Sequence, residues 1–255
     1  TGVGHQPDFI WIKSRSANSH RLTDAVRGAT KVLYSDLNFT QATESGVTSF
    51  DSDGFSLGTN ADSNGSTQNF VSWNWKAANS SGSSNSDGSI TSTVSANTTA
   101  GFSIVKFTAP SSGTFNVGHG LGVAPKCILM KKTNGTQNWI CYWNSLGSNK
   151  FVQLNTTASE FTNANMWQNT HPTSTLFYSN TSEIGASGEY IAYCFAEKKG
   201  YSKMGSYIGN GNADGTFIYT GFKPAFIITK KTSSTSNWSL LDNKRLGYNV
   251  DNNRT

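Results

Sequence analysis

A ten-residue motif occurs three times in the chain and constrains its fold more than any other feature. It occupies residues 4–13, 122–131 and 221–230, and each copy reads Gly-x-x-Pro, one variable residue, four mostly apolar or β-branched residues, then Lys. Glycine and proline followed by a short apolar run are typical of a loop that leads into a buried strand. Proline cannot donate a hydrogen bond to a sheet, so it suits the first residue of a strand. The chain is therefore built from repeated units.

The residues around the motif extend the repeat. The separation from Gly101 to Pro125 is the same as that from Gly200 to Pro224, and Asn-Trp follows the second and third motifs at Trp139 and Trp238. The first copy has His-Arg-Leu at 20–22 instead, so we expect surface roles to differ between copies.

Composition favours short strands joined by polar turns. Hydrophobic residues make up 35% of the 255 residues, charged residues 14% and aromatic residues 12%. Units of about 100 residues with seven or eight short strands and frequent Gly, Asn and Ser turns are typical of β-sandwiches. The repeats are too long for propeller blades or a solenoid. We predict an all-β protein of tandem β-sandwiches, jelly-roll or lectin-like, and no membrane span, because no long apolar run occurs.

The repeat predicts where the units begin and end. We expect a first sandwich at 1–78 whose start is incomplete, a Ser/Gly/Asn-rich linker at 79–100, a second sandwich at 101–199, and a partial third copy at 200–255. A half-unit cannot bury its own sheet face. We therefore expect the sequence to be a window on a longer polypeptide.

Charge and cysteine content narrow the possible partners. The net charge of +5 is mild, and the lysine pairs fall at predicted strand ends, where they keep sheet edges soluble; we expect no nucleic-acid partner. Cys127 aligns with Phe9 and Phe226, and Cys141 with Leu240, so both are interpreted as small buried hydrophobes. No CxxC spacing exists, which argues against a zinc site or a disulfide framework.

No motif for catalysis or cofactor binding stands out. Gly-x-Ser-x-Gly and HExxH are absent, and no acidic pair recurs in all copies, so we predict a non-enzymatic chain without a cofactor. Asn60, Asp62 and Asn64 place oxygens at alternate positions, as calcium loops do, and residues 210–215 repeat the pattern. The twelfth positions, where an EF-hand has Glu, are Val71 and Gly221. Ordinary Asx turns explain both loops, and no metal site is predicted.

Aromatic residues beside hydrogen-bonding groups form the candidate ligand contacts. Trp143 and Asn144 are adjacent, and the loop at 167–171 carries Trp167 and His171. A sugar-binding surface combines an aromatic face with such polar groups. Local packing is the alternative explanation for these side chains.

Several motifs together resemble a repeat domain of marine tailed-phage proteins. They are Pro-x-Phe-Ile-x-Ile-Lys at 7–13, Arg-Gly-Ala-Thr-Lys at 27–31, Ser-Asp-Gly-Phe at 52–55, Gly-His-Gly-Leu-Gly-Val-Ala-Pro at 118–125, and residues 193–203. In that family the domain occurs in tandem in large tail-fibre-like or other virion structural proteins. The resemblance implies a virion location, other virion proteins as partners, and a homo-oligomer. It supplies no catalytic residue.

We therefore expect a virion structural protein, a fibre or appendage of repeated β-sandwiches that contacts host-surface glycan. One alternative is a capsid- or tail-decorating spacer without a ligand. Another is a polysaccharide-degrading virion enzyme whose acidic pair comes from different loops. Fold class alone does not separate these functions.

Overall fold

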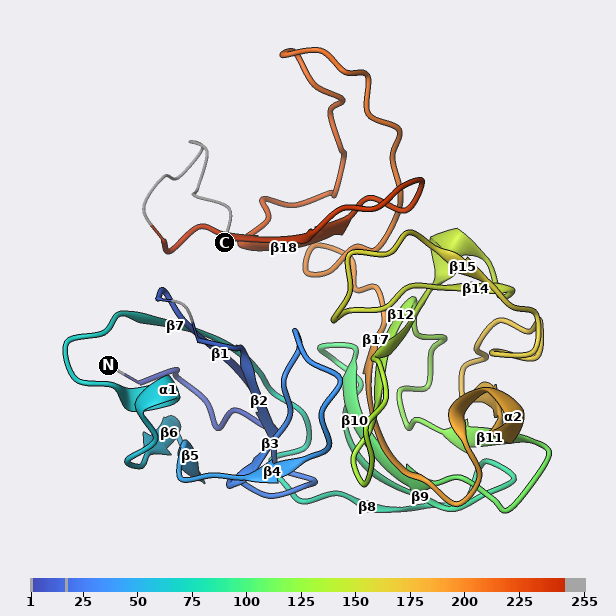
Figure 1. Cartoon of the computed structure of the whole chain (residues 1–255), viewed down its shortest axis with the longest axis horizontal. Coiled ribbons are helices and arrows are strands. Elements are labelled where there is room, and N and C mark those ends of the chain that lie inside the picture. The colour runs from blue at the N-terminus through green and yellow to red at the C-terminus, as the bar shows by residue number, and fades with distance from the viewer. Residues whose placement is uncertain (1, 17, 246–255) are drawn as a thin grey trace.

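The computed structural model describes residues 2–16 and 18–245, which consist almost entirely of strands and loops (Figure 1). The named strands pair antiparallel throughout. The α-helices in this part of the chain are single turns, α1 (Ala61–Asn64) and α2 (Thr181–Ile184), and a 3-10 turn covers Asn144–Leu146. Over the described ranges, no helix has the length and apolarity needed to cross a membrane. The predicted all-β class is confirmed.

The first unit, residues 2–78, is built on a three-stranded sheet in the order β2-β1-β7. Its motif strand β1 lies in the centre, with partners on both sides. Two hairpins, β3-β4 and β5-β6, complete the unit. The strand bounds are β1 (Phe9–Ser14), β2 (Arg21–Asp24), β3 (Lys31–Val32), β4 (Ala42–Thr43), β5 (Val47–Asp51), β6 (Gly54–Leu57) and β7 (Phe70–Trp75).

The second unit is built on a six-stranded sheet in the order β13-β12-β17-β10-β9-β8. Pairs β11-β16 and β14-β15 lie outside this sheet. The bounds are β8 (Ser83–Asn85), β9 (Ser92–Asn97), β10 (Phe102–Thr108), β11 (Thr114–Gly118), β12 (Cys127–Lys132), β13 (Ile140–Trp143), β14 (Lys150–Phe151), β15 (Phe161–Thr162), β16 (Leu176–Asn180) and β17 (Glu189–Phe195).

The predicted linker at 79–100 is wrong, because β8 and β9 belong to the six-stranded sheet. Strand β9 pairs with β10 over six residues, from Asn97 opposite Phe102 to Ser92 opposite Phe107. Serine-rich sequence offers little to bury, but its backbone still supplies a full set of ladder hydrogen bonds. The second unit therefore covers residues 79–199.

The third unit is described over 200–245 and contains the hairpin β18 (Phe226–Lys230) and β19 (Trp238–Asp242). The three motif strands share one register with the strand that follows each. Phe9 lies opposite Asp24, Cys127 opposite Trp143, and Phe226 opposite Asp242. The repeat read from the motif is therefore also a structural repeat.

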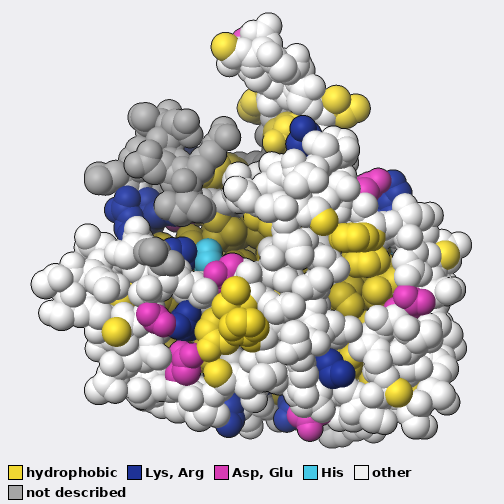
Figure 2. All heavy atoms as spheres, in the orientation of Figure 1, with side chains coloured by type: hydrophobic (Ala, Val, Ile, Leu, Met, Phe, Trp, Pro, Cys, Tyr) yellow, Lys and Arg dark blue, Asp and Glu magenta, His cyan; other side chains and the backbone are white. Residues whose placement is uncertain are grey.

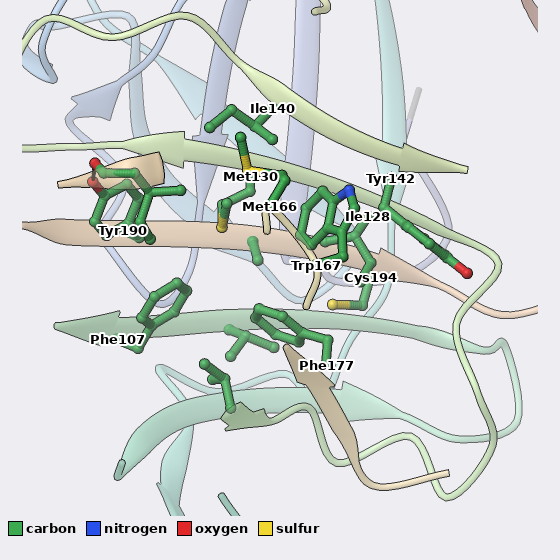
Figure 3. Close-up of a cluster of buried hydrophobic side chains, with 14 of the residues drawn as sticks. Phe107, Ile128, Met130, Ile140, Tyr142, Met166, Trp167, Phe177, Tyr190 and Cys194 are labelled. Carbon is green, nitrogen blue, oxygen red and sulfur yellow. Dashed lines mark hydrogen bonds between the residues drawn. The ribbon is translucent and has the colours of Figure 1, made fainter. Parts of the chain in front are cut away.

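Strand β12 shows why the motif is a continuous apolar run. Successive side chains of a strand point to opposite faces of the sheet. Ile128 and Met130 enter a core inside the second unit (Figure 3), whereas Cys127 and Leu129 enter a second core on the other face. A strand that is covered on both faces cannot alternate between apolar and polar residues.

The second core is shared by all three units. Phe9 stacks on Tyr193 of the second unit with ring centroids 4.1 Å apart, and Trp73 meets Phe226 of the third unit at 5.7 Å. Figure 1 shows the sheets of the first two units side by side, with β18 lying across them. The expected row of separate sandwiches is not confirmed, since the units pack their sheets against one another.

All three cysteines are buried and free, with Cys127 and Cys141 at apolar core positions as predicted.

Candidate functional site: the repeated unit interface

The four predicted ligand contacts do not form one surface. Trp167 is 1% exposed, its indole donates to the Lys150 carbonyl at 3.2 Å, and Figure 3 shows it within the core of the second unit. Its indole therefore offers no face to a ligand. The sequence placed Trp167 on a polar loop, and the loop turns this side chain inward.

The remaining three contacts lie on both sides of strand β13. The Tyr142 hydroxyl is 2.6 Å from Nδ1 of His171 and donates to Oδ1 of Asn144 at 3.3 Å. Trp143 belongs to the opposite face of the strand and packs against Trp238 of the third unit, with ring centroids 6.3 Å apart. Trp143 is therefore an interface residue, separated from Asn144 and His171.

The calcium-like loop is a helix start. Oδ1 of Asn60 accepts from the Asp62 backbone N–H at 2.9 Å and caps α1. Asp62 forms an ion pair with Arg21, and the Asn64 side chain donates to the Gly58 carbonyl at 2.8 Å. These three side chains thus serve local structure, and no group of three or more His, Cys, Asp or Glu in the described ranges is arranged to hold a metal ion.

The motif lysines carry a contact that recurs between successive units. Nζ of Lys131, from the second unit, donates to the Asn38 carbonyl of the first at 3.3 Å. Nζ of Lys230, from the third unit, donates to the Thr157 carbonyl of the second at 3.0 Å. In both cases the later unit donates and the earlier unit accepts.

Tryptophans repeat the same direction of donation. The indole N–H of Trp139 donates to the Tyr34 carbonyl of the first unit at 2.7 Å. The indole N–H of Trp238 donates to the Gln153 carbonyl of the second unit at 3.0 Å. Tyr34 follows β3 and Gln153 follows β14, so the acceptors are also equivalent.

Two backbone hydrogen bonds complete the repeated set. The backbone N–H of Gln41 donates to the Thr133 carbonyl at 2.9 Å, and the backbone N–H of Glu160 donates to the Thr232 carbonyl at 3.1 Å. In the reverse direction, the backbone N–H of residue 137 donates to the carbonyl of residue 38 and that of residue 236 to the carbonyl of residue 157, both at 2.9 Å. Four hydrogen bonds of the interface between the first two units therefore recur at equivalent positions between the last two. Such a head-to-tail contact is heterologous, because each unit uses two different surfaces.

The third unit also contacts the first, through residues equivalent to a pair that joins the first unit to the second. Arg27 of the first unit donates to the Tyr193 hydroxyl of the second at 3.1 Å. Arg245 of the third unit lies over the ring of Trp73 in the first, 5.5 Å from its centroid. Trp73 lies opposite Trp11 of β1, and Tyr193 lies opposite Leu129 of β12. Trp11 and Leu129 occupy the same position of the motif, so Trp73 and Tyr193 are equivalent. The three units thus contact one another in cyclic order around the shared core.

A buried charge cluster joins the first two units. Asp24 and Arg27 form an ion pair whose side chains are 0% and 2% exposed, and the Tyr193 hydroxyl donates to the Asp24 carboxylate at 2.7 Å. Burial raises the pKa of Tyr193 well above its usual value. Each group in this cluster has a partner and none faces solvent, so the cluster holds the interface together.

Lys131 was predicted to keep a strand end soluble, and that interpretation is wrong. The residue is only 1% exposed. Burial, assisted by Lys132 and Arg27, lowers the pKa of Lys131 to about 8. The sequence signal for a specific role was the lysine at the end of all three motifs, because a solvent-exposed position does not require the same residue type in every copy.

His20 makes the first unit different, as the sequence suggested. It precedes β2 at a position equivalent to that of Trp139, just before β13, and of Trp238, the first residue of β19. Its Nδ1 accepts from the Trp11 indole at 2.7 Å, and burial lowers the pKa of His20 to about 4, so the ring is neutral at pH 7. In the first unit this position therefore holds a neutral imidazole that accepts a hydrogen bond from its own unit, whereas Trp139 and Trp238 each donate to the preceding unit.

An all-β fold whose units dock through one repeated heterologous interface defines a repeat scaffold, in which the candidate functional surface is the interface itself. The model of a family described as a domain of unknown function, DUF7483, matches residues 1–255, and the chain belongs to that family. No curated protein and no solved structure matches the chain significantly.

Proposed function

We propose that this protein is a non-enzymatic structural component of a phage virion, in a fibre or another appendage built of repeated all-β units. The observation that carries the proposal is the set of four hydrogen bonds that recurs between successive units. Because the third unit also contacts the first, the repeated heterologous contact closes three units around one core, and such a block can serve as one segment of an appendage.

Open surfaces of the third unit support assembly with further units. Strand β18 pairs only with β19 in the described part of the chain, whereas β1 and β12 each have a strand on both sides. Free strand edges are templates for pairing with another chain. We propose that β18 accepts a strand of the β7 or β17 type from a neighbouring all-β unit.

Exposed apolar residues lie in the same unit. Ile208, Phe217 and Tyr219 are 88%, 85% and 78% exposed. Figure 2 shows hydrophobic side chains on the segment that projects from the body of the molecule. Large exposed apolar side chains that cluster mark protein contact surfaces. A second copy or another virion protein is the partner we propose for this segment.

Purified virions provide the test of location. Particles from the phage that encodes the chain are banded on a density gradient, and their peptides are quantified by mass spectrometry alongside the major capsid protein. We expect peptides of this chain at a fixed ratio to capsid, and antibody labelling at one structure of the particle. Recovery only in the particle-free lysate would contradict the proposal.

A further inference from the structure

We propose that a basic cleft beside the end of β7 binds an acidic saccharide. The inference rests on the proposed function, because a virion appendage can meet the host surface and its saccharides. The cleft has a volume of about 560 Å³, a size typical of small-ligand sites. Its lining includes His5, Asn74, Lys76, Lys198, Lys199 and Tyr201.

Short local contacts hold the walls of the cleft together. The Asn97 side chain donates to the Lys76 carbonyl at 3.4 Å and joins the end of β9 to the end of β7. On the opposite wall, Tyr201 donates its backbone N–H to the Lys198 carbonyl at 2.9 Å, closing a tight turn. Gly200 permits this turn because its φ is +76°, a conformation that other residues rarely adopt.

The charge of the cleft favours an anion. Lys76, Lys198 and Lys199 contribute three ammonium groups, and no Asp or Glu is among the lining residues. None of the three lysines takes part in an ion pair among the described residues. Glu197, next in sequence, is 3.7 Å from Lys203 and accepts from the Met204 backbone at 2.9 Å, so its charge is compensated elsewhere. A concave surface lined by one sign of charge concentrates ligands of the opposite sign.

Two buried polar atoms at the cleft have no protein partner in the described structure. They are Nε2 of His5 and Oδ1 of Asn74. Buried polar atoms are nearly always hydrogen-bonded, so each of these atoms gains a partner if its side chain turns toward a ligand in the cleft. A ring nitrogen and an amide oxygen match the alternating donors and acceptors of sugar hydroxyls.

Tyr201 favours a saccharide over a simple anion. The residue is 61% exposed and lines the cleft, where its ring offers an apolar face. Asn97 and Thr99 add an amide and a hydroxyl on the other wall. A sugar ring stacks its C–H face on an aromatic ring, and its carboxylate or sulfate group reaches the lysines. Inorganic phosphate uses the lysines alone.

Calorimetric titration of the full chain tests the inference. The probes are an oligogalacturonate, a sulfated oligosaccharide, a neutral oligosaccharide of equal length, inorganic phosphate and a single-stranded oligonucleotide. We expect the acidic saccharides to bind at least about tenfold more tightly than the neutral one, and more weakly as salt is raised. Absence of binding by both acidic saccharides would overturn the inference, as would equal or tighter binding of phosphate or the oligonucleotide.

Surface variants locate the binding. The double variant Lys198→Gln with Lys199→Gln and the variant Tyr201→Ala should each weaken binding by about tenfold or more. Lys106→Gln, at an exposed position of β10, removes one charge outside the cleft lining and should leave binding unchanged. Circular dichroism checks that each variant is folded. Saccharide binding that survives both cleft variants would overturn the site assignment, whereas absence from virions with binding intact would overturn only the proposed function.

Discussion

Replacing Lys131 by Met should change how the stability of the protein depends on pH. The lysine is 1% exposed, and burial lowers its pKa from 10.5 to about 8 in the folded protein. A difference of about 2.5 pH units corresponds to roughly 3 kcal/mol at about 1.4 kcal/mol per unit. This is the free energy by which protonation of Lys131 favours the unfolded chain.

The sign of the effect follows from proton binding. Between pH 8 and 10.5 the unfolded chain holds the proton while the folded protein has released it, so stability rises with pH across this window. Below pH 8 both states are protonated and the contribution is constant. The wild type should therefore gain up to about 3 kcal/mol from this group between pH 7.5 and 10.5, and the Met variant should not.

Urea unfolding followed by tryptophan fluorescence at several pH values measures the difference. Methionine nearly preserves the length of the side chain. The Asn38 carbonyl loses the ammonium donor in this variant, but it still accepts from the backbone N–H of Gln137 at 2.9 Å. Relative to wild type, the stability of the variant should fall by about 3 kcal/mol as the pH rises through the window. Lys106→Met, at an exposed position, serves as the control. Parallel pH profiles for wild type and Lys131→Met would refute the reasoning.

Three further outcomes concern the interface and core. Trp139→Phe removes the indole donor to the Tyr34 carbonyl and should lower the free energy of unfolding by about 1 to 3 kcal/mol, measured by urea unfolding. Asp24→Asn leaves the buried Arg27 charge uncompensated and should cost about 3 to 5 kcal/mol; a loss below about 1 kcal/mol would contradict the pairing. Burial raises the pKa of all three thiols, so Ellman's reagent should label the cysteines only after unfolding, and rapid labelling of the native protein would contradict their burial.

The motif predicted the parts of the fold that local sequence controls. Glycine, proline and an apolar run specify a buried strand, and β1, β12 and β18 begin two residues after the motif prolines. Alignment of the copies also placed Cys127 correctly, because Phe9 and Phe226 fill the same core position. These features depend on neighbours in sequence or on comparison between copies.

Contacts between units escaped prediction because they depend on which surfaces meet. Lys131 is polar by type, and its buried ammonium group is satisfied by the Lys132 carbonyl of its own unit together with the Asn38 carbonyl of the first unit. The small polar side chains of the stretch at 79–100 predict a linker, whereas β9 is held in the sheet by backbone pairing with β10. The polar neighbours of Trp167 predict a surface position, whereas the loop turns its side chain into the core. The cleft draws its walls from four separated segments, which no local pattern reveals.

The shared core has a consequence for synthesis on the ribosome. Asp24 of the first unit is satisfied by Tyr193, which lies 169 residues later in the chain. Translation at about 5 to 20 residues per second needs roughly 10 to 30 s to cover that distance. During this time the Phe9 face of β1 has no second unit to cover it. The nascent first unit thus exposes this apolar face until β17 has emerged.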